Sequence, residues 1–182
     1  QMNANAPLVV SIGEPAGIGA DVLLRAVDLS KRGQIPALPK FVVVADLPHL
    51  SARTDALSLQ LTLGDDHQSP STVLDITVVP LDHQFVGHPG VTDPRDAAGV
   101  IKAIRKSVSM VKGGTAAALV TLPINKEVLY QSGFEFPGHT EFLGHLAEGW
   151  PDCASNAKPV MMLASPLLRV VPLTIHIPLA QV

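Results

Sequence analysis

The sequence predicts an α/β fold with a mixed sheet and helices on both of its faces. Short apolar runs typical of strands alternate with amphipathic stretches typical of helices through most of the 182 residues. The run over residues 41–45 has no polar alternation, as in a strand that is covered on both faces. Two later apolar runs joined by Ser165-Pro166 predict an antiparallel hairpin, which makes the predicted sheet mixed.

The first expected elements form a strand–turn–helix unit. Residues 8–12 are a short apolar run and predict a buried strand. Residues 13–19 contain three glycines and predict a tight turn, after which helical spacing begins. A second buried strand is expected over residues 41–45, with Asp46 as the cap of a helix that ends near Ala56.

The middle of the chain predicts two strands, a loop and a long helix. Residues 57–63 and 73–81 alternate apolar and polar side chains, as strands do, and residues 82–94 form a loop. Asp93-Pro94 is typical of a helix start, and Gly113-Gly114 of a helix end. The apolar stripe of this helix consists of Ala97, Val100, Ile101, Ile104, Val108 and Val111.

The last third of the chain predicts four further elements. Residues 116–122 read as a buried strand, and a short helix is expected to begin at Asn125. Residues 138–148 have helical spacing. The runs over residues 160–164 and 168–174 are the two strands of the predicted hairpin.

Composition excludes several classes of protein. Charged residues make up 16% of the chain, below the roughly 25% of typical soluble domains, and the net charge is -3. A nucleic-acid partner and intrinsic disorder are therefore not expected. The sequence has no run of 18 apolar residues and no signal-peptide pattern, so no membrane partner is expected. The single cysteine, Cys153, rules out an internal disulfide and favours a reducing, cytoplasmic location.

Glu14 is the informative residue of the glycine-rich turn. Glycines between a strand and a helix allow backbone amides to approach an anion. The spacing is neither that of a dinucleotide-binding fingerprint nor that of a P-loop. Because a carboxylate would repel phosphate, Glu14 suggests a polar substrate contact instead. The alternative is a tight turn that binds no ligand.

Three other clusters are candidates for a functional site. Asn125 and Lys126 follow a predicted strand, where open α/β sheets bind ligands, and either hold a carboxylate or phosphate or simply begin a helix. His139 and Thr140 either contact a substrate anion or are a surface residue and a plain helix cap. His176 ends an apolar run and is either a metal ligand or, as is more common for a lone histidine, structural.

Four strings of residues, in this order, carry a resemblance that covers essentially all 182 residues. The strings are Gly13-Glu-Pro-Ala-Gly-Ile-Gly19, Thr121-Leu-Pro-Ile-Asn-Lys126, Phe136-Pro-Gly-His-Thr-Glu-Phe142, and Met161-Met-Leu-Ala164 with Thr174-Ile-His-Ile-Pro-Leu179. Through these strings the chain resembles the 4-hydroxythreonine-4-phosphate dehydrogenase family of pyridoxal phosphate biosynthesis, known as PdxA.

The resemblance implies a fold like that of isocitrate and isopropylmalate dehydrogenases, and a homodimer with active sites at the subunit interface. It implies oxidation of 4-phosphohydroxy-L-threonine by NAD or NADP, after which the β-keto acid loses carbon dioxide and yields 3-amino-2-oxopropyl phosphate. A divalent metal, Zn, Mg or Co, would be held by three histidines. Such a metal would lower the pKa of the substrate hydroxyl and stabilise the enolate.

Carried over to this sequence, the resemblance implies that His139 and Thr140 bind substrate and that His176 is the first metal ligand. Family members continue for roughly as long again. Residues 1–182 are therefore expected to be the N-terminal portion of a PdxA-like dehydrogenase, without the C-terminal half and inactive alone. The alternatives are a relative acting on 4-phospho-threonate or an aromatic cis-dihydrodiol, a non-catalytic dimerisation or anion-binding fragment, and an acetyl- or butyryl-phosphate transferase.

Overall fold

The computed structural model describes residues 6–65, 73–150, 158–174 and 178–181. The chain divides into two compact units, Gln1–Pro137 and Gly138–Val182, which are described separately below. Cys153 and His176 lie outside the described residues, so the predictions made for them stay predictions.

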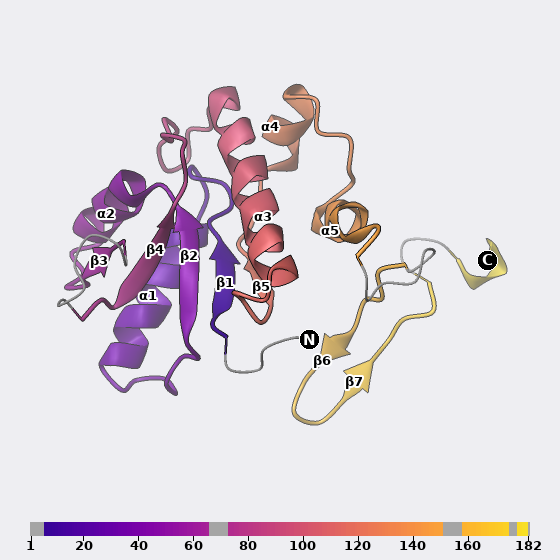
Figure 1. The fold of residues 1–182 in the computed structure, drawn as a ribbon, viewed down its shortest axis with the longest axis horizontal. Helices are drawn as coiled ribbons and strands as arrows, with labels where there is room; N and C mark the ends of the chain where they lie inside the picture. Colours follow the sequence, from indigo (N-terminus) through magenta and orange to yellow (C-terminus); the bar gives the residue numbers. More distant parts are fainter. Residues whose placement is uncertain (1–5, 66–72, 151–157, 175–177, 182) are drawn as a thin grey trace. The chain divides into compact units, whose positions relative to one another are not determined.

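The first unit is built on a five-stranded sheet in which every described pair of neighbouring strands is parallel. The strand order is β3-β4-β2-β1-β5, so β1 lies between β2 and β5 (Figure 1). The strands are β1 (Leu8–Ser11), β2 (Phe41–Ala45), β3 (Leu63–Gly64), β4 (Ile76–Pro80) and β5 (Leu119–Thr121). Since all are parallel, their carboxyl ends lie along one edge of the sheet.

Helices cover both faces of this sheet, as predicted. The connections from β1 to β2 and from β2 to β3 run toward one edge of the sheet, and the connection from β4 to β5 runs toward the other edge. Because such crossovers are right-handed, the helices of the first two connections lie on one face and the helix of the third lies on the opposite face. Figure 1 shows α1 and α2 on one side of the sheet and α3 on the other. The helices are α1 (Gly19–Lys31), α2 (Leu47–Ala56), α3 (Ala97–Lys112) and α4 (Lys126–Gln131), and a 3-10 turn, η1 (Pro94–Asp96), precedes α3.

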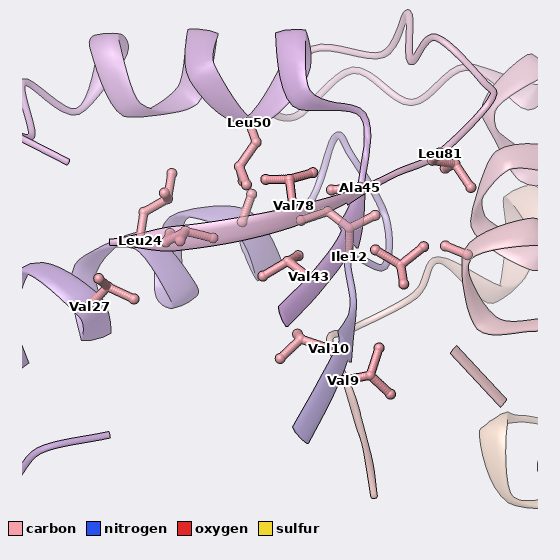
Figure 2. Close-up of a cluster of buried hydrophobic side chains, with 14 of the residues drawn as sticks. Val9, Val10, Ile12, Leu24, Val27, Val43, Ala45, Leu50, Val78 and Leu81 are labelled. Carbon is pink, nitrogen blue, oxygen red and sulfur yellow. The ribbon is translucent and has the colours of Figure 1, made fainter. Parts of the chain in front are cut away.

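The core lies between the sheet and these helices. Val9 and Val10 are both buried and point in opposite directions from β1, because alternate side chains of a strand face opposite sides of a sheet (Figure 2). Leu24 of α1 and Leu50 of α2 are fully buried in the same cluster. This two-sided burial is the reason that the strand runs lack polar alternation.

Most predicted elements of the first unit are confirmed, with shorter strands than expected. The strand predicted over residues 57–63 is wrong except for its last residue. Leu57 instead ends α2, and Ser58 has a left-handed φ of 54° that turns the chain away from extended pairing. The expected strand over residues 116–122 shrinks to β5, whose central Val120 is 41% exposed rather than buried.

Asp46 precedes α2 as predicted, but its side chain does not cap that helix. The carboxylate accepts a hydrogen bond from the backbone N–H of Phe85 at 3.1 Å instead. A backbone N–H that is taken out of water without an acceptor costs free energy. The Asp46 carboxylate therefore satisfies the Phe85 N–H, and it does not cap α2.

The described part of the second unit contains one helix, α5 (His139–Ala147), and one antiparallel strand pair, β6 (Leu163–Ala164) and β7 (Arg169–Val170), followed by the 3-10 turn η2 (Leu179–Gln181). The predicted hairpin is therefore confirmed. It forms a two-stranded sheet of its own, so it does not add an antiparallel strand to the five-stranded sheet, whose described strand pairs are all parallel. None of the helices in the described part of the chain combines the length and apolar character needed to cross a membrane.

Candidate functional site

A pocket of about 620 Å³ lies in the first unit, beyond the carboxyl ends of the neighbouring strands β1 and β5. Open α/β sheets bind ligands in this position, because the connections that leave adjacent strands there diverge to different elements. The lining residues come from three segments and are Glu14, Ala16, Gly17, Ile18, Gly90, Thr92, Pro123, Ile124, Asn125, Lys126 and Glu127. The first and third segments are two of the four strings singled out in the sequence.

Backbone contacts hold these two segments together. Leu122 N–H donates to the Ser11 carbonyl at 3.2 Å, and Glu14 N–H donates to the Pro123 carbonyl at 2.8 Å. Gly13 lies between them with φ of +72°, where a Cβ atom would overlap the Pro123 carbonyl oxygen. A glycine at this position is required both by the left-handed backbone and by the close approach.

Glu14 is 4% exposed and contributes a buried carboxyl group to the pocket lining. Its Oε1 accepts a hydrogen bond from Ala16 N–H at 3.1 Å, whereas Oε2 has no hydrogen-bond partner among the described residues. Burial raises the pKa of Glu14 above its ordinary value, the Ala16 hydrogen bond opposes this, and the negative charge of Asp96 raises it further. Glu14, the predicted substrate contact, is therefore a buried acid whose Oε2 has no hydrogen-bond partner among the described residues.

The raised pKa of Glu14 predicts a specific pH dependence of stability. Between its ordinary pKa, about 4.3, and the raised pKa, the folded state holds more protons than the unfolded state. The contribution of Glu14 to the free energy of unfolding therefore falls as pH rises through this window. We expect Glu14→Gln to become progressively more stable than the original protein as pH rises from about 4, until the difference levels off above the folded pKa.

Urea denaturation at a series of pH values measures this difference. Glu127→Gln, which removes a carboxylate from the exposed neighbour on α4, is the matched control. A stability difference for Glu14→Gln that stays constant with pH would contradict the assignment.

Asn125 and Lys126 lie side by side where α4 begins. The Oδ1 of Asn125 accepts hydrogen bonds from Glu127 N–H at 3.1 Å and Val128 N–H at 3.3 Å. This oxygen therefore caps the start of α4, which is the alternative role given to Asn125 above. Only the amide nitrogen of Asn125 is left to contact a ligand. Lys126 is exposed, lines the pocket, and forms no ion pair with any residue that the structure describes. Its ammonium group is thus available to an anion.

The second segment of the lining, Gly90 and Thr92, belongs to loop 83–92, where the sequence offered no candidate site residue. Gly90 N–H donates to the Ala16 carbonyl at 2.8 Å, which joins this loop to the glycine-rich turn. Asp96 is completely buried and accepts from Val86 N–H at 3.0 Å and Gly87 N–H at 2.7 Å. The only signal in the sequence was an acidic residue in the first turn of a predicted helix, which local reasoning assigns to that helix.

His139 and Thr140 are the first two residues of α5 in the second unit, and both are half-buried. Gly138 occupies the cap position, so the alternative in which Thr140 caps the helix is wrong. That these two residues face the same cleft as Asn125 and Lys126 stays a prediction. Among the residues that the structure describes, no three or more His, Cys, Asp or Glu side chains form a group fit for a metal ion.

Comparison with known proteins agrees with the four strings. Residues 37–182 match the family described as "Pyridoxal phosphate biosynthetic protein PdxA". The 4-hydroxythreonine-4-phosphate dehydrogenases of Xanthobacter autotrophicus and Roseobacter denitrificans are each 41% identical to this chain, over 100% and 98% of its length. The chain spans 51% of each of these relatives.

A solved structure extends the similarity to the fold. The crystal structure of 4-hydroxythreonine-4-phosphate dehydrogenase from Klebsiella pneumoniae superimposes with a TM-score of 0.77 at 26% identity, and the match covers 100% of this chain and 53% of that one. The fold expected from the resemblance is thereby confirmed. With its parallel sheet, its glycine-rich turn and the residues matched by the family, this chain belongs to the PdxA family of pyridoxal phosphate biosynthetic proteins.

Proposed function

We propose that the chain is the N-terminal portion of an NAD- or NADP-dependent 4-hydroxythreonine-4-phosphate dehydrogenase that acts in the cytoplasm. The reaction oxidises the hydroxyl of 4-phosphohydroxy-L-threonine, and loss of carbon dioxide then gives 3-amino-2-oxopropyl phosphate. The observation that carries the proposal is that two of the family strings line one pocket at the carboxyl ends of β1 and β5. The names of the two relatives described above support the same substrate.

Within this proposal, the described residues bind and orient the substrate. Lys126 neutralises an anionic group, and the amide nitrogen of Asn125 donates beside it. Glu14 contacts a polar group through its unused oxygen. His139 and Thr140 are proposed as further substrate-binding residues on the resemblance alone. The nicotinamide accepts the hydride when it is bound.

The described residues contain no group of three or more His, Cys, Asp or Glu side chains that fits a metal ion. His176 is proposed as the first of three histidine ligands of Zn, Mg or Co on the resemblance alone.

A homodimer is part of the same proposal. The second unit carries apolar side chains that are at least one-third exposed along one short hairpin and its flanks. These are Val160, Met161, Met162, Leu163, Leu167, Leu168, Val170, Val171 and Leu173. Exposed apolar side chains concentrated in one short segment are typical of protein interfaces, and a second copy of the chain is the proposed occupant.

A chimera tests the proposed activity. Residues 1–182 of this chain would replace the corresponding half of the Xanthobacter autotrophicus relative, which they match over their full length. We expect the chimera to reduce NAD or NADP when given 4-phosphohydroxy-L-threonine, and the 182-residue chain alone to give no turnover. A folded chimera that oxidises 4-phospho-threonate or a cis-dihydrodiol instead would favour those alternatives. A folded chimera with no dehydrogenase activity would favour an anion-binding fragment.

Lys126→Ala in the chimera is expected to lower kcat/KM by roughly 10- to 100-fold, mainly through KM. The reason is that a charge-assisted hydrogen bond to an anion contributes about 1.5–3 kcal/mol. Steady-state kinetics of reduced nicotinamide formation measure the effect. Lys112→Ala, which removes an exposed lysine from the last turn of α3, is the matched control. Equal kinetic effects of the two substitutions would contradict a role for Lys126 in binding.

A further inference from the structure

A second buried acid, Asp96, lies behind the pocket wall and does not line the pocket. Asp96 lies behind loop 83–92, with no exposed surface, and accepts hydrogen bonds from two successive backbone N–H groups, those of Val86 and Gly87. The preceding N–H, that of Phe85, donates to Asp46. Two carboxylates from outside the loop thus satisfy three consecutive backbone donors, which precede the isolated antiparallel bridge between His88 and Val91.

Loop 83–92 has little freedom to move away from this position. A Cβ atom at Gly87 would lie 2.7 Å from Oδ2 of Asp96 and 3.6 Å from the Cβ of Ala16. The backbone of the loop is therefore enclosed between Asp96 on one side and the glycine-rich turn on the other. At its start, the loop packs on Gly99 of α3 through the side chains of His83 and Phe85. The contact is so close that a Cβ atom at position 99 would lie 2.7 Å from the Phe85 ring.

The far end of the loop forms the pocket wall. Gly90 and Thr92 line the pocket, and Gly90 N–H donates to the carbonyl of Ala16. Ala16 N–H in turn donates to Oε1 of Glu14. A continuous series of contacts therefore leads from Asp96 through the loop to Ala16 and the carboxyl group of Glu14.

We propose that Asp96 is a positioning residue of this pocket, which fixes loop 83–92 as a wall against the glycine-rich turn and thereby orients Glu14 toward the ligand. Asp96 contacts no ligand itself. It acts on Glu14 in two ways, through the hydrogen-bonded loop and through its negative charge, which helps to keep the Glu14 pKa raised. This role deepens the proposed function but concerns geometry that exists without substrate.

Several other charged or titratable groups lie around these two acids. Lys126 and Glu127 of α4 share the pocket lining with Glu14. The Nε2 atom of His83 lies 3.9 Å from Oδ1 of Asp96. Burial lowers the pKa of His49, and the charges of Asp46 and Asp96 oppose that effect. None of these groups changes in the substitutions used below.

Asp96→Asn tests the proposal, because it preserves shape but removes the charge and one of the two acceptors. We expect exchange of the Val86 and Gly87 amide hydrogens, followed by NMR, to accelerate by at least about tenfold, as for the loss of roughly 1.4 kcal/mol of hydrogen bonding. We also expect the 13C-detected titration of the Glu14 carboxyl, assigned with Glu14→Gln, to move to lower pH. A merely structural residue would not move that titration.

Two further variants make the outcome decisive. Asp93→Asn is the matched control, since Asp93 lies in the same turn but accepts from Arg95 near the surface. Gly87→Ala crowds Asp96 from the loop side and keeps its charge, so it is expected to accelerate amide exchange with a smaller effect on the Glu14 titration. It also replaces Asp96→Asn if that variant does not fold.

The proposal is overturned if Asp96→Asn leaves loop exchange and the Glu14 titration as they are in Asp93→Asn. In the chimera, Asp96→Asn is expected to raise KM for 4-phosphohydroxy-L-threonine more than it lowers kcat. That kinetic measurement rests on the proposed function, whereas the two NMR measurements do not. Failure of the proposed activity is thus distinguishable from failure of the positioning role.

Discussion

Gly13→Ala is expected to lower the free energy of unfolding by about 2–4 kcal/mol. A left-handed backbone costs a residue with a Cβ atom roughly 1–2 kcal/mol, and the new Cβ would overlap the Pro123 carbonyl and lie 2.9 Å from that of Leu122. The ends of β1 and β5 must then separate, and their separation weakens the hydrogen bond from Glu14 N–H to Pro123. Urea denaturation followed by far-UV circular dichroism measures the loss.

Gly33→Ala is the matched control for this prediction. Gly33 has a φ of +70°, almost equal to that of Gly13, but no described atom lies within 4 Å of the position of its Cβ. Its substitution should therefore cost only the backbone strain, about 1 kcal/mol. Equal losses for the two glycines would show that the close approach between the two pocket segments contributes nothing to stability.

Leu163→Asp in the chimera is expected to raise the dissociation constant of the proposed homodimer by at least about 100-fold, or roughly 2.7 kcal/mol. Leu163 of β6 lies directly opposite Val170 of β7, so their side chains share one face of the hairpin. These side chains are 63% and 41% exposed in the single chain. A carboxylate buried in an apolar interface without a partner costs several kcal/mol.

Sedimentation velocity over a range of concentrations measures the dimer. Val73→Asp is the matched control, because Val73 is 91% exposed and belongs to the first unit. A chimera that remains monomeric at every concentration contradicts the homodimer. A Leu163→Asp chimera that dimerises as well as Val73→Asp shows that the hairpin is not its interface.

The sequence by itself was sufficient wherever local patterns and burial agree. The apolar runs of β1 and β2 and the stripe of α3 predicted elements that the structure confirms, because each pattern directly reports which faces are covered. The same is true of Asn125, whose cap was readable from its place before α4. The family strings likewise identified the relatives that the comparisons found.

The sequence also predicted the two ends of the pocket without their wall. Glu14 and the Asn125–Lys126 pair were separate candidates in the sequence. They line one pocket because β1 and β5 are parallel neighbours and carry their carboxyl ends to the same edge, and only the structure shows that these two strands are neighbours. Neither the burial of Glu14 nor its unused oxygen was readable, because both depend on loop 83–92 packing over the turn.

Only the tertiary structure decided where the acids Asp46 and Asp96 act. Both stand at helix starts, where local rules assign a carboxylate to its own helix, yet both accept hydrogen bonds from loop 83–92. The strand expected over residues 57–63 failed for a similar reason, since alternation does not reveal that Ser58 has a left-handed backbone. For the two acids the physical cause is the same. A buried N–H must find an acceptor wherever the fold supplies one, and distant partners leave no periodic trace in the sequence.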